Sequence, residues 1–150
     1  MSEIEVGKRV PDFRLPATGG GELGLEDFAG RPLVLYFYPK DSTPGCTKEG
    51  QAFRDLYPRF RELGVEIAGV SRDGLKAHEN FKTKQGFPFE LLSDREETLC
   101  RLFDVIREKN MYGKKVMGIE RSTFLIDADG KIAREWRKVK VPGHAEDVLA

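Results

Sequence analysis

The stretch from Pro32 to Cys46 reads PLVLYFYPKDSTPGC. Its first part, Pro32–Tyr38, is apolar or aromatic almost throughout, and Pro39 ends the run. A continuous apolar run of this length is typical of a strand whose two faces are both covered. The polar loop Lys40–Gly45 follows and leads to Cys46. We therefore expect a buried central strand that passes through a short loop into a helix carrying Cys46.

The segment after Cys46 repeats apolar side chains at helical spacing, at Phe53, Leu56, Tyr57, Phe60 and Leu63. This pattern predicts an amphipathic helix that ends at Gly64 and is kinked by Pro58. Residues three or four positions apart share a helical face, so Cys46 should lie near Gly50 and Phe53. We expect the sulfur to occupy a partly shielded pocket.

The rest of the chain alternates strand and helix patterns and closes with a hairpin, for which the Asp-Gly pair at residue 130 is a strong signal. The expected strands or extended segments are Phe13–Leu15, Leu23–Leu25, Val65–Val70, Phe89–Leu92, Ser122–Ile126 and Lys131–Trp136. The expected helices are Leu75–Gln85, a helix marked by Leu99, Leu102, Phe103 and Ile106, and Pro142–Ala150. This order favours an α/β protein with a mixed central sheet flanked by helices, and the thioredoxin-like fold is the natural candidate.

The length of 150 residues fits a single domain that spans residues 1–150. The longest linker, Ala17–Gly24, contains three consecutive glycines and is expected to be a turn region. Gly19–Gly24 also fits the glycine pattern of dinucleotide sites, but no long helix follows it. Asp127–Gly130 begins like a calcium loop, yet it lacks the later acidic ligands and a hairpin explains it. We expect no cofactor and no metal.

The 25 Lys and Arg residues balance the 25 Asp and Glu residues, so composition favours neither nucleic acid nor a membrane surface as a partner. The basic clusters Lys114–Lys115 and Arg137–Lys140 lack interleaved aromatic residues and are expected to be solvated loops. No apolar run reaches membrane-spanning length, and the first residues lack the features of a secretory signal. The two cysteines, Cys46 and Cys100, are too few for a disulfide scaffold. We expect a cytoplasmic protein.

Cys46 is the strongest candidate for chemistry. If Thr43 is the N-cap, Pro44 takes the first helical position, where its missing N–H costs nothing, and Cys46 takes the third. The sulfur then faces unpaired backbone N–H groups, and helix N-termini favour the nucleophilic thiolate form of a cysteine. The two histidines are weaker candidates, because His78 falls on the apolar stripe of its helix as a half-buried structural residue and His144 falls in a terminal loop.

The pattern Pro39-x-x-x-Thr43-x-x-Cys46 resembles the active-site motif of the peroxiredoxins. Phe37–Pro39 before it and Thr47–Glu49 after it are similar to the bacterioferritin-comigratory (PrxQ) subgroup. Further matches extend over nearly the whole chain, at Phe13–Pro16, Leu91–Asp94 and Arg121–Asp127. The resemblance implies a thiol peroxidase with a thioredoxin-like fold and a role in antioxidant defence.

The same resemblance implies a role for each matching residue. Cys46 would be the peroxidatic nucleophile, which attacks the O–O bond of hydrogen peroxide or an organic hydroperoxide and becomes a sulfenic acid. Thr43 and Arg121 would stabilise the leaving oxygen, since preorganised donors stabilise a developing alkoxide. Pro39 would shield the pocket from water, and Glu49 would orient Arg121.

The chain departs from the subgroup at the resolving cysteine. Many members carry it five residues after the peroxidatic cysteine, where this chain has Gln51, and others carry it in the helix that corresponds to Leu75–Gln85, which has none here. Cys100 matches a cysteine without a resolving role in the family, so we expect it to be structural, with resolution of Cys46 as the alternative. An external thiol would then reduce the enzyme: thioredoxin, glutaredoxin, glutathione or the second copy of a weak homodimer, although the protein could equally be a monomer.

Two other functions remain open at this point. A thiol-disulfide oxidoreductase of the same fold needs a C-x-x-C pair, and here Thr43 stands where its first cysteine would be. A non-catalytic binding module would not require the set of Pro39, Thr43, Cys46 and Arg121. A peroxide-consumption assay distinguishes both from a peroxidase.

Overall fold

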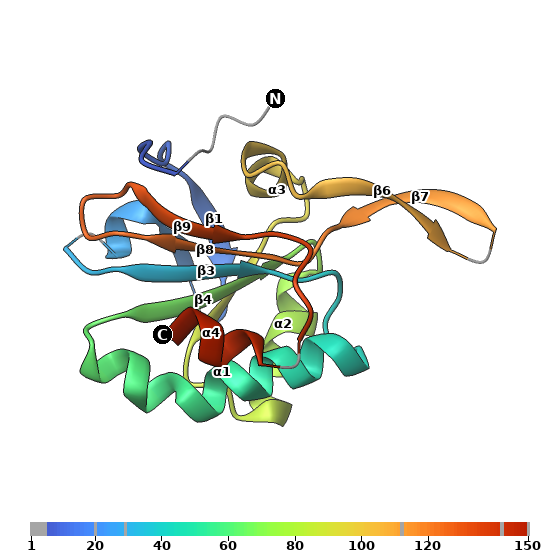
Figure 1. Cartoon of the computed structure of the whole chain (residues 1–150). Helices are drawn as coiled ribbons and strands as arrows, with labels where there is room; N and C mark the ends of the chain where they lie inside the picture. Colours follow the sequence, from blue (N-terminus) through green and yellow to red (C-terminus); the bar gives the residue numbers. More distant parts are fainter. Residues whose placement is uncertain (1–5, 20, 29, 112, 142, 150) are drawn as a thin grey trace.

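Seven strands form one mixed sheet at the centre of the protein (Figure 1). The computed structural model describes residues 6–149 except 20, 29, 112 and 142. In spatial order the strands are β2 (Gly21–Gly24), β1 (Arg14–Ala17), β5 (Glu90–Ser93), β4 (Glu66–Ser71), β3 (Leu33–Phe37), β8 (Ser122–Ile126) and β9 (Ile132–Trp136). The α-helices are α1 (Pro44–Glu62), α2 (Leu75–Gln85), α3 (Thr98–Leu102) and α4 (His144–Leu149), and η1 (Leu25–Phe28) is a 3-10 helix. The predicted α/β architecture with a mixed sheet is confirmed.

Strand β3 separates two hydrophobic cores. All of its residues are buried, as expected of a strand that is covered on both faces. Leu33, Leu35 and Phe37 point into one core together with residues of α3. Val34 and Tyr36 point into the other core, which α1, α2 and α4 cover (Figure 1). The alternation follows from the period of two along a strand.

The pairing of β3 decides which loops meet. β3 runs parallel to β4, and β4 runs parallel to β5, so the carboxyl ends of these strands lie at one edge of the sheet. β8 runs antiparallel to β3 with Ser122 opposite Phe37, which brings the preceding residue, Arg121, to the same edge. Open α/β sheets carry their sites at this edge. The loop from β3 to α1 is therefore a neighbour of Arg121.

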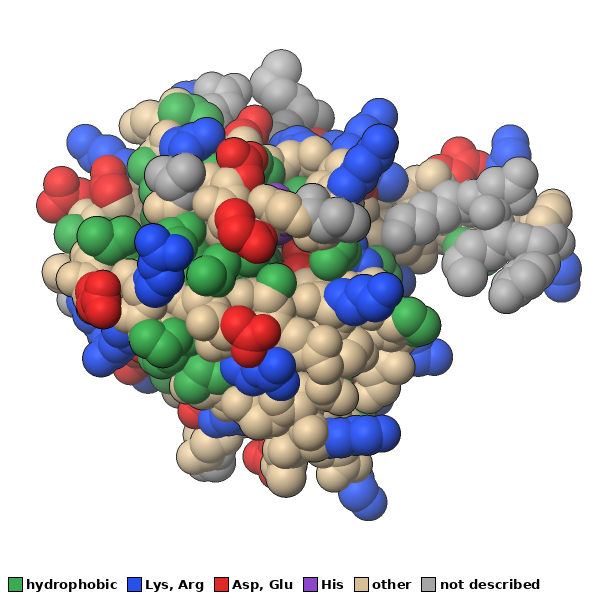
Figure 2. Space-filling view, turned by 60° about the horizontal axis from the view of Figure 1, so that its bottom comes forward, with side chains coloured by type: hydrophobic (Ala, Val, Ile, Leu, Met, Phe, Trp, Pro, Cys, Tyr) green, Lys and Arg blue, Asp and Glu red, His purple; other side chains and the backbone are tan. Residues whose placement is uncertain are grey.

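The two long helices begin and end close to the predicted residues. α1 continues through Pro58 to Glu62, and the chain turns away at Gly64, where φ is 75°. α2 has the predicted bounds, and Gly86 caps it in the left-handed region that glycine adopts without steric cost. Within the described part of the chain, no helix has both the length and the apolar character needed to cross a membrane. Charges of both signs are interspersed over the face shown in Figure 2.

The expectation that Ile106 ends a helix is wrong. α3 stops at Leu102, because Asp104 has a φ of 55° that leaves the helical path. Ile106 instead begins β6 (Ile106–Met111), which pairs with β7 (Lys114–Ile119) in an arm that extends away from the body of the protein (Figure 1). The pattern misleads because Leu102 and Ile106 are four residues apart, which also fits a helix.

Two predicted loops also differ from the structure. Lys114–Lys115 lies in β7 rather than in a loop. Ala17–Gly24 contains the end of β1 and all of β2, which pair as an antiparallel hairpin; its Gly20 lies outside the described residues. Arg137–Lys140 lies outside the helices and strands, as predicted.

The predicted C-terminal helix is confirmed as α4, with Pro142 and Ala150 outside the described residues. His144 begins this helix and is buried, whereas the sequence predicts it in a terminal loop. Its Nε2 lies 2.8 Å from Thr123 Oγ1, so a polar contact with β8 compensates its burial.

Candidate active site

The side chains expected to carry the chemistry meet where β3 leads into α1 and where β8 begins. Cys46 lies in the first turn of α1 and is 2% exposed. Arg121 donates from Nη2 to Cys46 Sγ at 3.4 Å and from Nη1 to Glu49 Oε1 at 2.6 Å. Residues from two distant parts of the sequence thus form one cluster of sulfur, guanidinium and carboxyl group.

The local sequence explains where Cys46 lies. Thr43 is the N-cap with an extended backbone, and Pro44 is the first helical residue, as predicted. The carbonyl of Thr43 accepts the first helical hydrogen bond, from the N–H of Thr47 at 2.8 Å. The N–H groups of the first turn carry partial positive charge, and the guanidinium of Arg121 adds a full one. Both positive charges, that of the helix N-terminus and that of Arg121, favour an anion at the sulfur.

Two glycines of α1 allow close approaches. A Cβ at Gly45 would lie 3.2 Å from Arg121 Nη2, so the absence of a side chain leaves room for the guanidinium above the first turn. A Cβ at Gly50 would clash with the ring of Phe87, so α1 packs tightly against the segment that follows the cap of α2. The sulfur is therefore enclosed by the predicted helical face, with Phe53 also buried.

Glu49 is almost completely enclosed, at 1% exposure. Burial raises the pKa of its carboxyl group to about 7, although the charge of Arg121 and its hydrogen bond act in the opposite direction. Its Oε2 has no hydrogen-bond partner within the described part of the chain. The group beside Arg121 therefore changes its charge near neutral pH.

This raised pKa predicts a pH-dependent difference in stability between the wild type and Glu49→Gln. The folded pKa of about 7 lies above the ordinary 4.5, so the carboxyl group favours the folded state fully below pH 4.5 and loses that contribution as the pH rises to 7. From pH 5 to pH 8 the free energy of unfolding of the wild type should fall by about 2 kcal/mol relative to Glu49→Gln. Denaturant unfolding of both proteins at the two pH values measures this difference. A constant difference would mean that Glu49 does not titrate in this range.

Thr43 and Pro39 lie in the loop before the helix. The hydroxyl of Thr43 donates to the carbonyl of Lys40 at 2.8 Å and makes no side-chain cap bond to α1. Its hydrogen is therefore used within the loop, and its oxygen retains the capacity to accept one. Pro39 is half-buried. Its role as a shield stays a prediction.

Cys100 lies on the other face of the sheet from Cys46. It belongs to the core that contains Leu35 and Phe37, whereas Cys46 belongs to the core on the opposite side of β3. Its N–H donates to Asp94 Oδ2 at 2.7 Å. Burial, together with the charge of Asp94, raises the pKa of the Cys100 thiol far above its usual range. The sheet separates the two sulfur atoms, which favours the structural role for Cys100.

A buried polar network that the sequence does not predict lies next to the loop. Tyr38 donates from its hydroxyl to Asp41 Oδ1 at 2.6 Å, and Asp41 Oδ2 lies 2.6 Å from His78 Nδ1. His78 is fully buried rather than half-buried, since its Nε2 also has a partner in the carbonyl of Leu92 at 2.8 Å. Asp41 and His78 are 37 residues apart, and no local pattern indicates that they meet.

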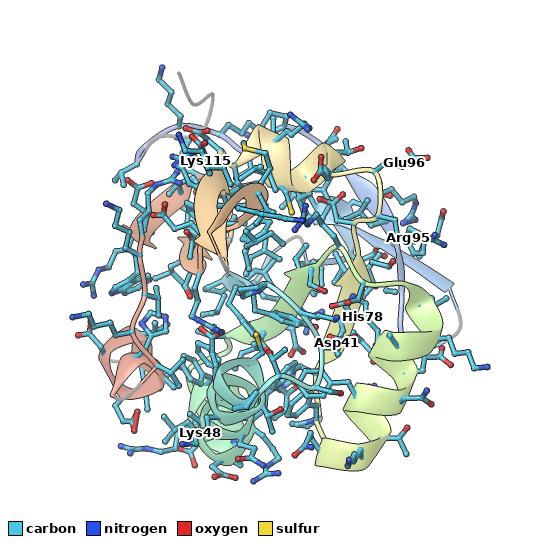
Figure 3. All side chains as sticks on the ribbon, turned by 90° about the vertical axis from the view of Figure 1, so that its right-hand side faces the viewer. Asp41, Lys48, His78, Arg95, Glu96 and Lys115 are labelled. Carbon is cyan, nitrogen blue, oxygen red and sulfur yellow. The ribbon has the colours of Figure 1, made fainter. Side chains whose placement is uncertain are left out.

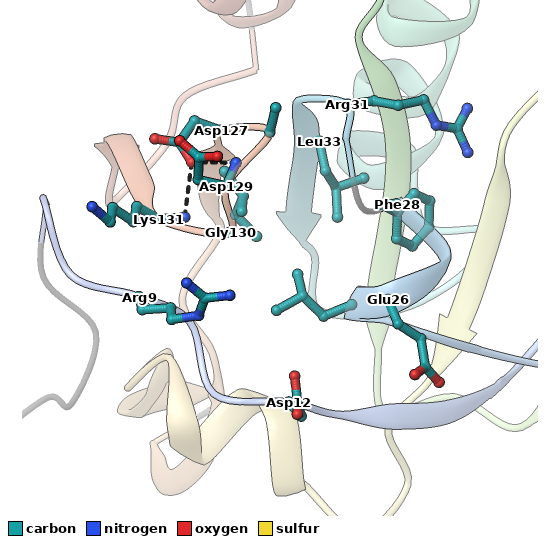
Figure 4. Close-up of a pocket in the computed structure, with 13 residues that line it drawn as sticks. Arg9, Asp12, Glu26, Phe28, Arg31, Leu33, Asp127, Asp129, Gly130 and Lys131 are labelled. Carbon is teal, nitrogen blue, oxygen red and sulfur yellow. Dashed lines mark hydrogen bonds between the residues drawn. The ribbon is translucent and has the colours of Figure 1, made fainter.

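A cavity of about 500 Å³ lies at the opposite end of β3 (Figure 4). It is lined by Leu33 at the start of β3, by Phe28, and by Asp127–Gly130 after β8, with Arg9 and Lys131 at its rim. None of the predicted site residues lines it. This cavity is therefore separate from the cluster around Cys46.

A thioredoxin-like sheet that holds a cysteine at the start of a helix, beside an arginine, defines the peroxiredoxin class of thiol peroxidases. The chain belongs to the AhpC/TSA family, whose model matches residues 6–135. Within that family it belongs to the Bcp/PrxQ group. It is a thiol-dependent peroxidase that works through a peroxidatic cysteine.

Several similar proteins and solved structures support this assignment. Peroxiredoxin Bcp of Xanthomonas campestris is 60% identical over 147 residues, which are 98% of this chain and 92% of that protein. Peroxiredoxin Bcp of Bacillus subtilis is 50% identical over 146 residues, 97% of this chain and 93% of that one. A structure of X. campestris peroxiredoxin Q has a TM-score of 0.90 at 56% identity and covers 99% of this chain and 94% of its own. The crystal structure of a cysteine-to-serine mutant of Xylella fastidiosa PrxQ has a TM-score of 0.93 at 48% identity, with 99% and 95% covered.

Proposed function

We propose that Cys46 is the peroxidatic cysteine and that Arg121, Glu49, Thr43 and Pro39 form its active site. The observation that carries the proposal is the contact of 3.4 Å between Cys46 Sγ and Arg121 Nη2 at the start of α1. A thiolate at this position has two sources of positive charge, the helix N-terminus and the guanidinium. Cys46 is also a free cysteine, as a nucleophile must be.

The reaction transfers one oxygen atom to sulfur. The Cys46 thiolate attacks the terminal oxygen of the hydroperoxide, an S–O bond forms, and the O–O bond breaks. Sulfur is oxidised by two electrons to a sulfenic acid, and the peroxide is reduced to an alkoxide or hydroxide, which takes a proton and leaves as alcohol or water. Charge develops on the leaving oxygen, so a donor fixed beside it accelerates this step. Arg121 supplies that donor.

The remaining residues hold this geometry. Glu49 fixes Arg121 through the bond of 2.6 Å to Nη1, which leaves Nη2 for the sulfur and the peroxide. Thr43 is suited to accept the O–H of the incoming hydroperoxide, because its own hydrogen is donated to Lys40 O. Pro39 limits the access of water to the thiolate from the loop side.

The substrates in this proposal are hydrogen peroxide and organic hydroperoxides. Support for the organic class comes from a structure of the X. campestris bacterioferritin comigratory protein, 55% identical to this chain, whose description concerns alkyl peroxide reduction. The protein would act in antioxidant defence in the cytoplasm, where a free cysteine stays reduced.

An external thiol completes the cycle in this proposal. It attacks the sulfenic sulfur of Cys46, releases water and forms a mixed disulfide, which a second thiol reduces. Gln51 stands at the usual resolving position, where its Nε2 donates to Gln85 Oε1 at 2.9 Å. Thioredoxin, glutaredoxin and glutathione are the candidate reductants, and the protein acts as a monomer or a weak homodimer.

The lack of a nearby thiol predicts the product of peroxide treatment. One equivalent of peroxide should add one oxygen to the intact mass as a sulfenic acid, and excess peroxide should add a second as a sulfinic acid. Intact mass spectrometry checks this, with Cys46→Ser as the control that should gain no oxygen. A loss of two hydrogens would instead reveal an intrachain disulfide and contradict the external-thiol cycle. Repeating the measurement with thioredoxin or glutathione present identifies the thiol that captures the intermediate.

A further inference from the structure

The polar network next to the active-site loop has no part in the chemistry described above. Asp41 joins this network to the loop, and its side chain is 5% exposed while that of His78 is fully buried. Figure 3 shows the two labelled side chains next to each other where the loop faces α2. The backbone N–H of Asp41 donates to Asp73 Oδ2 at 2.7 Å, and the hydroxyl of Tyr38 donates to Asp41 Oδ1. The loop is therefore held through both the backbone and the side chain of one residue.

The hydrogen bonds place the hydrogens of this network. The carbonyl of Leu92 can only accept, so His78 Nε2 carries a hydrogen. The distance of 2.6 Å between His78 Nδ1 and Asp41 Oδ2 requires a second hydrogen between them. Burial raises the pKa of Tyr38 well above its usual value, so the phenol keeps its hydrogen and donates it to Asp41 Oδ1. Asp41 and His78 are therefore joined by one shared hydrogen, and both side chains have further partners.

The same groups are spaced like metal ligands, since atoms of Asp41, Asp73 and His78 lie within 4.8 Å of one another. All three side chains already have hydrogen-bond partners, however. Both nitrogens of His78 are engaged, and Asp73 Oδ2 accepts from the Asp41 N–H and from the hydroxyl of Ser71 at 2.7 Å. A shared proton accounts for the cluster without a cation.

The residue after Asp41 shows what the network supports. Ser42 has a φ of 63°, in the left-handed region that is unfavourable for residues other than glycine. Such a conformation persists only where its surroundings enforce it. Here Asp41 is fixed on one side of Ser42, and Thr43 begins α1 on the other. The turn at Ser42 directs the chain into the first helical turn and Cys46.

We propose that Asp41 and His78 are a positioning pair, which holds Ser42 in its left-handed conformation and thereby sets Thr43 and Cys46 for reaction with peroxide. The proposal rests on the proposed function of Cys46. The pair acts through the backbone and touches neither the sulfur nor the peroxide. Without it, Ser42 relaxes to negative φ, and Thr43 and the first turn of α1 shift relative to Arg121.

The test compares Asp41→Asn with the double variant Asp41→Asn/Ser42→Gly. The single change removes the carboxylate, and the rate constant of Cys46 with hydrogen peroxide, measured by stopped flow, should fall at least about tenfold. Glycine adopts the left-handed conformation without steric cost, so adding Ser42→Gly should recover at least about fivefold. Ser42→Gly alone should stay within about twofold of the wild type. Because relief of strain at Ser42 also adds stability, the rate constants are compared where circular dichroism shows every variant to be folded, so that the recovery reports positioning.

Lys82 provides a matched control, because it pairs with Glu90 and so links α2 to β5, and none of its bonds reaches the loop. Lys82→Gln should leave the rate constant within about twofold of the wild type. Nitrogen NMR of the wild-type His78 ring should show a hydrogen on Nε2 and a hydrogen bond at Nδ1, which tests the pair without any variant. If Asp41→Asn does not fold, Asp73→Ala replaces it, because Asp73 accepts the N–H of Asp41. The comparison is then between Asp73→Ala and Asp73→Ala/Ser42→Gly.

The outcomes separate the two proposals. A His78 ring without a hydrogen bond at Nδ1, an unchanged rate constant in Asp41→Asn, or no recovery in the double variant would overturn the positioning role while the wild type still consumes peroxide. A wild type that does not react with peroxide at Cys46 would overturn the proposed active site instead.

Discussion

Replacing Cys46 with serine should abolish peroxide consumption, with a loss of at least about a thousandfold in rate. Serine occupies nearly the same volume at the start of α1, but its hydroxyl keeps its hydrogen at neutral pH and is a poor nucleophile toward the O–O bond. The positive charge of Arg121 and of the helix N-terminus then has no thiolate to stabilise. Steady-state loss of hydrogen peroxide, with dithiothreitol as reductant, measures the effect.

Cys100→Ser is the matched control, because it makes the same atomic change in the other core. It should retain most of the peroxidase activity, since the sheet separates Cys100 from the site. A buried hydroxyl in an apolar core costs stability, so circular dichroism should first establish that both variants are folded at the assay temperature. Full activity in Cys46→Ser would refute the assignment of the nucleophile, and comparable losses in both variants would assign resolution to Cys100.

Arg121→Ala should slow the reaction of Cys46 with peroxide by about a hundredfold. The substitution removes the cation that contacts the sulfur at 3.4 Å and the donor that stabilises the leaving oxygen. Alkylation of the sulfur by iodoacetamide should slow as well, because the same cation lies beside it. The alkylation profile reports the reactivity of the sulfur, and stopped flow reports the peroxide step. An unchanged alkylation profile would contradict the contact between Arg121 and Cys46.

Removing Arg121 also leaves Glu49 buried without its partner, which lowers stability by itself. The double variant Arg121→Ala/Glu49→Gln separates this effect, because it should recover stability but not the rate of the peroxide step. Thr43→Val offers a second comparison. It should slow the peroxide step with less effect on the alkylation profile, since Thr43 acts on the hydroperoxide rather than on the charge of the sulfur.

The parts of the fold that the sequence predicts are those in which one local pattern dominates. Pro32–Tyr38 is apolar without interruption, and such a run fits little else than a doubly covered strand. α2 ends at Gly86 because glycine allows the left-handed cap. The start of α1 follows from Thr43 and Pro44, whose capping preferences place Cys46 in the first turn.

The parts that the sequence does not predict depend on contacts between distant residues. Ile106 has the spacing of a helix but pairs in a hairpin, and only the turn at Asp104 decides between them. His144 is buried because Thr123 in β8, 21 residues earlier in the chain, provides a partner for its ring. The approach of Arg121 to Cys46 follows from the antiparallel register of β8. The resemblance to a family implies this approach, whereas no local pattern in the sequence predicts it.

The hydrogen bond between Gln51 and Gln85 implies that the two halves of the proposed catalytic cycle use different parts of the protein. The oxidative half depends on the cluster around Cys46, whereas the usual location for the reductive half is taken by an amide pair that bonds neither Arg121 nor Glu49. On the proposed cycle, substitution of Gln51 or Gln85 is expected to change the reduction of Cys46 and to leave its reaction with peroxide unaltered.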